Sequence, residues 1–505
     1  MGMGRGKKLT INTITSLLLQ ITTLICGFIL PRLILRMFGS EVNGLVNSIT
    51  QFLGIISLLD LGVTSVVQSS LYKPLAESNW ELISKIYVSA HSFFKKIAFI
   101  LLAYLILITI LYPFFVDSSF GYIYVSSLIF AIGIGSFFQY YFGIVNSIVL
   151  NADQMSYVLY ISRIITVILN TLICYILLKL NFSIQIMKLA SSLVFIARPV
   201  FLAWYVNRRY PIDRKVDNNG EPIKQKWNGI AQHFASFVLT GTDSIILTCF
   251  SSLSNVSIYG VYNLVITGLK NMFFSISGGF ESLIGDMLAR NEKEKALKLF
   301  AYMEWFMHNI VVLIFGCTGV LIVNFVKVYT NGINDANYVQ PFFATLLTIA
   351  NAGHCLRLPY SVVILAAGHY KQTQSNYIIT VFLNIIVSII MVFKFGLIGV
   401  AIGTLVAMFF QTIWMAWYDS RNIIEWPFNK FIKQLIVDCI SVFTASLATF
   451  KIPLLSINYK SWFFLALEVA CVWFVIVCLI NFVFYRPMVV SLFHRIKKKI
   501  NRKLL

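Results

Sequence analysis

Six basic side chains stand within or at the borders of long apolar segments, where charged groups are rare. They are Arg32, Arg36, Arg163, Arg198, Lys270 and Arg357. A charge in hydrocarbon is costly unless it meets a partner or water, so most of these groups should face a bundle interior or reach its edge. Arginine can bind a phosphate through two parallel hydrogen bonds. A cavity that gathers these groups from both halves of the chain would therefore bind an anion, and a phosphate best of all.

Four acidic residues share the apolar segments, and two roles are open to them. They are Asp60, Asp243, Glu281 and Glu304. They could neutralise the bases in structural salt bridges, or they could couple transport to H+ or Na+. Even with every acid paired, six bases against four acids leave an excess of positive charge, which favours an anionic ligand.

Two details of this set can each be interpreted in two ways. Arg32 and Arg36 share one helix face because they are four residues apart, and both could snorkel to the membrane surface instead of lining a cavity. Asp60 either faces the cavity or pairs with Arg36 or another base, which would set the second apolar segment against the first.

Other kinds of site find little support in the sequence. His233, His308 and His354 each lie alone in an apolar segment, where a histidine is more often a hydrogen-bonded core residue than a proton relay. No cysteine lies at metal-ligand spacing from another cysteine or a histidine, and there is no glycine-rich phosphate loop. We therefore expect no metal, no cofactor and no ATP hydrolysis. The polar loops are too short for a catalytic domain, so an enzyme is not expected.

The elements that position these groups must be membrane helices. The chain has 505 residues, is 58% hydrophobic and 12% charged, and has a mean hydropathy of +0.80. A soluble protein of this length could not bury so much apolar surface, whereas a membrane protein exposes it to lipid. We expect an all-α polytopic membrane protein with about 14 transmembrane helices. The predicted spans are 10–37, 43–70, 84–112, 121–149, 155–179, 183–206, 229–250, 256–285, 299–328, 341–367, 374–394, 396–418, 433–453 and 462–485.

The basic residues indicate how the chain crosses the membrane. Lysine and arginine outnumber the acids 40 to 20, and most of them fall in segments on the same side as the N-terminus. Because cytoplasmic loops carry such an excess, we expect both termini in the cytoplasm. The basic tail 486–505 should rest on anionic lipid headgroups. Nucleic acid is not expected as a partner, because no soluble basic domain is present to bind it.

Three short patterns recur 213 to 216 residues apart, which predicts an internal repeat. The pairs are 165–170 (ITVILN) with 379–384 (ITVFLN), 75–87 with 288–300, and 42–47 with 258–263. The matched spans cross the membrane in the same direction, so the repeat is parallel. We expect six-helix lobes in 1–215 and 216–428, two additional helices in 429–485, and the tail in 486–505. Glycines 396, 399 and 403 are spaced for close helix packing.

The stretch 38–77, FGSEVNGLVNSITQFLGIISLLDLGVTSVVQSSLYKPLAE, resembles the first helical hairpin of polysaccharide flippases. These are the O-antigen and exopolysaccharide transporters of the multidrug/oligosaccharidyl-lipid/polysaccharide exporter superfamily. A turn at Gly44, the run LDLG at 59–62 and the loop LAE at 75–77 carry the likeness. Chain length, span number and parallel halves agree with it along nearly the whole chain.

The resemblance implies an architecture and a substrate. The architecture would be a V-shaped, MATE-like pair of six-helix lobes that rock between inward-open and outward-open states. The substrate would be an oligosaccharide on a polyprenyl diphosphate carrier, such as an O-antigen, capsule or exopolysaccharide repeat unit, moved from the inner to the outer leaflet. Polysaccharide polymerase machinery is a further partner that the resemblance suggests. The resemblance also implies a bacterial inner or plasma membrane as the location of the protein.

Three other functions compete with this one. A multidrug extruder of the same superfamily would expel organic cations and should have an acidic cavity, which the excess of bases disfavours. A lipid II flippase of peptidoglycan synthesis would also have fourteen helices and a cationic cavity, and the sequence does not separate it from a polysaccharide flippase. A membrane enzyme is disfavoured by the short loops.

Overall fold

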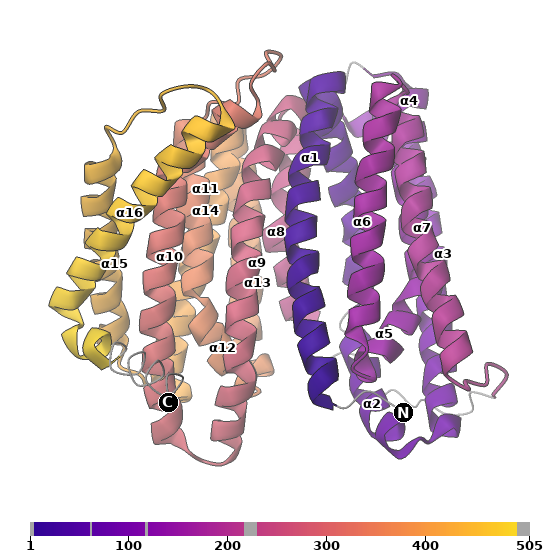
Figure 1. Ribbon diagram of the computed structural model, residues 1–505, viewed down its shortest axis with the longest axis horizontal. Coiled ribbons are helices and arrows are strands. Elements are labelled where there is room, and N and C mark those ends of the chain that lie inside the picture. The colour runs from indigo at the N-terminus through magenta and orange to yellow at the C-terminus, as the bar shows by residue number, and fades with distance from the viewer. Residues whose placement is uncertain (1–4, 61–62, 117–119, 217–229, 492–505) are drawn as a thin grey trace. The chain divides into compact units, whose positions relative to one another are not determined.

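The computed structural model describes residues 5–60, 63–116, 120–216 and 230–491, and their regular structure is helical with no strand among them (Figure 1). Ten helices in this part of the chain have the length and the apolar composition needed to cross a membrane. The expected all-α polytopic fold is confirmed. Most of the basic tail and the middle of the long polar loop, 217–229, lie outside the described residues.

The described chain forms two compact units, unit 1 (1–260) and unit 2 (261–505). The elements of unit 1 are α1 (Arg5–Gly54), η1 (Ile55–Asp60), α2 (Val63–Glu77), α3 (Trp80–Phe115), α4 (Tyr122–Phe138), η2 (Gln139–Gly143), α5 (Ile144–Ala152), α6 (Ser156–Lys179), α7 (Ile184–Arg209) and α8 (Ile230–Phe250). Helix α9 (Leu253–Ala289) begins in unit 1 and continues into unit 2. The other helices of unit 2 are α10 (Lys293–Tyr329), α11 (Pro341–Leu356), α12 (Leu358–Ala366), α13 (Tyr370–Phe395), α14 (Leu397–Asn422), α15 (Phe428–Thr449) and α16 (Tyr459–Phe484). The predicted lobe boundary at 215 and 216 stays a prediction.

Each predicted span has a helical counterpart in the described chain, but three of them are interrupted. The second is broken by the 3-10 helix η1, and the fourth contains the π-helix η2. The tenth is divided at Arg357, between α11 and α12. Pro359, near the start of α12, explains this break because proline has no N–H and its ring clashes with the preceding turn.

The expectation of a turn at Gly44 is wrong. Gly44 lies inside α1 on a face packed against the start of α9, where a Cβ would overlap the backbone carbonyl of Leu253. Beside it, Asn43 Nδ2 donates a hydrogen bond of 2.8 Å to Ser257 Oγ. The absence of a side chain at Gly44 lets the two helices approach. The turn between the first two predicted spans is made by Gly39, whose φ is +83°.

The internal repeat is visible in the turns between helices. Ser78 and Asn291 stand 213 residues apart, and their φ values are +55° and +57°. Gln154 and Gly368 stand 214 residues apart, with φ values of +58° and +72°. In all four turns the next residue donates its N–H to the carbonyl five residues earlier, at 2.8 to 3.1 Å. Non-glycine residues seldom adopt a positive φ, so these coincidences support a parallel repeat.

Each unit has its own apolar core. In unit 1 one cluster joins α2, α3, α5 and α7, and another joins α1, α3, α4 and α6. In unit 2, α15 and α16 pack against α10 (Figure 1). The fully buried Trp473 belongs to the apolar cluster of these helices. Helices α6 and α7 form an antiparallel hairpin in unit 1, because a short loop connects two long helices that pack together. This hairpin carries Arg163 and Arg198.

Candidate functional site

Two irregular turns of unit 1 meet beside Arg198. Pro199 follows Arg198 in α7 and cannot donate an N–H to the carbonyl of Phe195, one turn earlier. The π-helix η2 widens a turn between α4 and α5, and π-turns of this kind are frequent at functional sites. Gly143, the last residue of η2, permits the approach of α7, since a Cβ there would lie 3.0 Å from the Pro199 Cβ.

Arg163 and Arg198 line one polar pocket of about 380 Å³, which we name the cationic pocket. Its lining residues are Ile132, Gly135, Ser136, Gln139, Tyr140, Arg163, Ser192, Phe195 and Arg198. They come from α4, η2, α6 and α7, so the pocket lies within unit 1. No carboxylate is present among these described lining residues.

Neither arginine of the cationic pocket is neutralised by another described residue. Arg163 and Arg198 form no ion pair or hydrogen bond within the described chain, and the buried Nε of Arg198 has no acceptor. Like charges repel at short range, and a buried donor without an acceptor is costly. An anion between the two guanidinium groups would relieve both costs. The arrangement is chemically compatible with an anionic ligand, and its role as a binding site stays a prediction.

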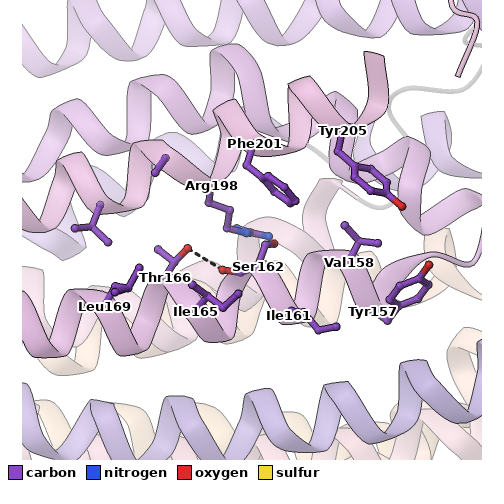
Figure 2. A pocket seen from close by; sticks show the side chains of 12 residues that line it. Tyr157, Val158, Ile161, Ser162, Ile165, Thr166, Leu169, Arg198, Phe201 and Tyr205 are labelled. Atoms are coloured by element: carbon purple, nitrogen blue, oxygen red, sulfur yellow. Dashed lines mark hydrogen bonds between the residues drawn. The ribbon is translucent and has the colours of Figure 1, made fainter. Parts of the chain in front are cut away.

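Arg198 also lines a second cavity, which we name the α6–α7 groove. Its volume is about 490 Å³, and its lining residues are Tyr157, Val158, Ile161, Ser162, Ile165, Thr166, Leu169, Val194, Ala197, Arg198, Phe201 and Tyr205. Figure 2 shows Arg198 reaching from α7 toward Ser162 on α6. The hydroxyls of Ser162 and Thr166 donate to carbonyls of their own helix, at 3.0 and 2.8 Å. Apart from Arg198, the groove therefore presents a mainly apolar wall.

The end of the groove at Tyr157 is tied to α1. Lys8 Nζ lies 3.2 Å from Asp153 Oδ1, and the Tyr210 hydroxyl donates to Asp153 Oδ2 at 2.6 Å. Burial and this bond to a carboxylate raise the pKa of Tyr210, so its hydroxyl remains a donor at neutral pH. Asn12 Oδ1 accepts the backbone N–H of Tyr157 at 2.8 Å. These bonds fix the start of α6 against the end of α7.

Unit 2 holds a second group of cations. Arg357 stands at the break between α11 and α12 and is 7% exposed. Its Nη2 lies 3.3 Å from His354 Nδ1, while its Nε and Nη1 have no hydrogen-bond partner in the described chain. Lys270 of α9 is 6% exposed and is another charge that acts on His354. The predicted cations thus include a pair in each unit, and a cavity that joins the two pairs stays a prediction.

The buried acids accept hydrogen bonds from tyrosine and histidine. Glu304 Oε1 accepts from the Tyr360 hydroxyl at 2.5 Å, and Asp243 Oδ2 accepts from the Tyr259 hydroxyl at 3.0 Å. His308, expected to be a hydrogen-bonded core residue, is fully buried and places Nδ1 2.5 Å from an oxygen of a further acid on α15.

Sequence reasoning missed two acids in unit 2. The partner of His308 is Asp438, a carboxylate within an apolar span, which is the signal that singled out the other acids. Asp419 is fully buried, and neither of its carboxylate oxygens has a partner within the described chain. It lies just beyond the predicted end of its span. The described residues contain no group of three or more His, Cys, Asp or Glu side chains placed to hold a metal ion.

The remaining predicted residues are not among the lining residues of the cationic pocket. On α1, Arg32 is half-buried and Arg36 is exposed, and on α9 Glu281 is half-buried. The side chains of Asp60 and His233 lie outside the described residues.

No protein-family model matches the sequence, and no curated protein matches it. Solved structures do match. A lipid II flippase, MurJ, in an inward closed conformation has a TM-score of 0.68 at 15% identity, covering 95% of this chain and 100% of that chain. An inward-facing multidrug resistance MATE family transporter of the MOP superfamily has a TM-score of 0.62 at 14% identity, covering 83% and 99%.

A third solved structure, a MATE protein in the bent conformation, has a TM-score of 0.56 at 13% identity, covering 84% of this chain and 97% of that chain. Identities this low show a common fold and leave the substrate open. The chain therefore has the MATE-like fold found in a lipid II flippase and in multidrug transporters.

Proposed function

We propose that this protein is a flippase for lipid-linked oligosaccharides. It moves an oligosaccharide on a polyprenyl diphosphate carrier from the inner to the outer leaflet of a bacterial plasma membrane, by alternating access, and it is not an enzyme. The cationic pocket supports this proposal, because Arg163 and Arg198 present unpaired guanidinium groups with no carboxylate among the described lining residues. Guanidinium groups bind phosphate oxygens through paired, charge-assisted hydrogen bonds.

The energetics of the substrate agree with such a pocket. A diphosphate cannot enter hydrocarbon without a polar lining, whereas its isoprenoid tail never has to leave hydrocarbon. With the cell interior negative, outward movement of a negative charge releases about 2.3 kcal/mol per charge for each 100 mV. The membrane potential could therefore drive this transport, and the scheme does not require coupling to H+ or Na+.

The solved structures of the same fold suggest two alternatives. A lipid II flippase would use the same cationic pocket and differ in the sugar it carries, and the MurJ structure with a TM-score of 0.68 is such a protein. A multidrug extruder would bind organic cations, for which two unpaired arginines are unsuitable. Transport measured with each class of substrate distinguishes all three.

Arg163→Ala and Arg198→Ala are each expected to slow transport about 10- to 100-fold. A hydrogen bond to a charged group contributes about 1.5–3 kcal/mol, and about 1.4 kcal/mol is a factor of ten. The measurement uses proteoliposomes that contain a fluorescent polyprenyl-diphosphate oligosaccharide, and it follows the fraction of label that reaches the opposite leaflet.

The matched controls are Lys179→Ala at the end of α6 and Arg208→Ala at the end of α7. Each removes one charge from the same hairpin where the side chain contacts an aromatic ring at the helix end. Both should transport at nearly the wild-type rate. Wild-type transport by the Arg163→Ala/Arg198→Ala double variant would refute the proposal. Export of an organic cation in place of the lipid would favour the multidrug function, and a preference for lipid II would favour the peptidoglycan function.

Surface labelling tests the expected orientation. In a cysteine-free background, Asp335→Cys should react with a membrane-impermeant maleimide in intact cells, because it lies in an exposed loop after α10, on the predicted outer side. Asp213→Cys, exposed after α7, should react only in permeabilised cells. The opposite pattern would place the termini outside.

A further inference from the structure

The cationic pocket and the α6–α7 groove share one wall residue, Arg198. The pocket is polar, whereas the groove is mainly apolar and open at its side. Ile161, Ile165 and Phe201 in the groove are 43%, 52% and 40% exposed, which suits contact with membrane lipid. A molecule that fits both cavities must join an anionic group directly to an apolar chain.

The depth of Arg198 in the membrane limits which molecule can occupy the two cavities. The groove follows α6 from Tyr157 to Leu169, about 18 Å at 1.5 Å per residue, which is more than half of the roughly 30 Å of hydrocarbon. Arg208 and Arg209 end α7 and mark a membrane surface near Tyr157. Arg198 lies about 16 Å deeper than Arg209, close to the middle of the bilayer. A phosphate held there has left the membrane surface.

We propose that the α6–α7 groove holds the isoprenoid tail of the transported lipid while Arg163 and Arg198 hold its phosphates. This proposal rests on the proposed function for the identity of the lipid. The charge at Arg198 suits the phosphate end of the chain, and the apolar walls on either side suit the hydrocarbon that follows. A groove of about 490 Å³ between two helices accommodates one chain, whereas a membrane phospholipid carries two acyl chains.

This arrangement divides the task of translocation between two neighbouring cavities. The diphosphate exchanges water for guanidinium groups in the cationic pocket, which removes the cost of placing it in hydrocarbon. The tail stays in contact with the bilayer through the open side of the groove. Tyr157 and Tyr205 line the end of the groove nearest the membrane surface, where the amphipathic ring of tyrosine is favoured (Figure 2).

Photolabelling tests the proposal directly. The full-length protein in nanodiscs receives a polyprenyl phosphate with a diazirine on the isoprene unit nearest the phosphate, and mass spectrometry locates the labelled peptides. We expect the label on α6 and α7, with Ile165→Trp lowering it about tenfold because the indole fills the groove. The matched control is Ile176→Trp, also on α6, since the two isoleucines are 52% and 54% exposed and only Ile165 lines the groove.

A second variant tests the groove independently, in case Ile165→Trp misfolds. Ala197→Phe fills the groove from α7 and should lower labelling as Ile165→Trp does. Labelling spread over lipid-facing helices, or equal labelling of Ile165→Trp and Ile176→Trp, would overturn the proposal. Competition by phosphatidylglycerol as effective as by unlabelled polyprenyl phosphate would also overturn it, because the groove would then be a phospholipid site.

The groove and the proposed function can fail separately. If Arg163→Ala and Arg198→Ala lose transport while Ile165→Trp is labelled as strongly as the wild type, the flippase function is supported and the groove proposal is refuted. If the groove is labelled as expected but the arginine variants transport at the wild-type rate, the tail site stands and the flippase mechanism through the cationic pocket falls.

Discussion

Gly399→Leu is expected to leave little folded protein in the membrane. Gly399 of α14 lies against α13, where a Cβ would overlap the backbone carbonyl of Met391 and lie 2.6 Å from the Val392 nitrogen. A backbone cannot turn aside as a side chain can, so the two helices would have to separate. Overpacking of this kind costs about 3 kcal/mol or more. The yield of monodisperse protein after detergent extraction and its melting temperature measure the effect.

The control for this experiment is Gly278→Leu on α9. Gly278 is exposed, and a Cβ there would have no neighbour within 4 Å, so leucine should be neutral or slightly stabilising in a helix. Gly403→Leu should resemble Gly399→Leu, because a Cβ at Gly403 would lie 2.6 Å from the Ser388 nitrogen. Equal melting temperatures for Gly399→Leu and Gly278→Leu would contradict the close contact of α13 and α14.

The glycine spacing on α14 could be interpreted from sequence because small residues at these intervals are typical of membrane helix contacts. Gly396 has a different role from the packing glycines. Its φ of +53° belongs to the turn that ends α13, and glycine adopts such a positive φ without strain. The membrane spans could also be predicted from sequence, because long apolar runs in a chain of this composition indicate membrane helices. Helices such as α10 extend beyond the predicted span because their polar ends continue outside hydrocarbon.

The sequence also allows the prediction that Arg163 and Arg198 lie near each other. The loop between their spans is short, so the helices must be antiparallel neighbours. Arg163 and Arg198 stand at similar distances from that loop and therefore lie at similar depth. Their side of the hairpin was not predictable, because it depends on how each helix is rotated against α4 and on the irregular turn η2.

Contacts between distant helices could not be predicted. Nothing in the sequence joins Lys8 to Asp153, or Asn43 to Ser257, because the packing order of distant segments is set by the whole fold. The Gly44 turn failed for the same reason. A glycine in an apolar run can end a helix or admit a neighbour, and the position of α9 decides between them.

Asp438→Leu and His308→Leu are each expected to destabilise unit 2 by about 3–5 kcal/mol, because each leaves a buried polar partner unsatisfied. His308 Nδ1 lies 2.5 Å from Asp438 Oδ2, and Gln434 Nε2 donates to Asp438 Oδ1 at 3.0 Å. His308 belongs to a stripe on α10 that binds the two additional helices, since Trp305 Nε1 donates to Asn481 Oδ1 on α16 at 3.0 Å.

The His308→Leu/Asp438→Leu double variant should recover most of that loss, because well-packed apolar side chains can replace a buried pair at little cost. Thermal unfolding of the four proteins in nanodiscs gives the coupling energy of the pair. Additive losses would show that the two residues do not act together. If the pair attaches α15 to α10 and moves no proton, the double variant will transport lipid with the wild-type pH profile. A proton relay through His308 requires the opposite, a folded double variant whose transport no longer responds to pH.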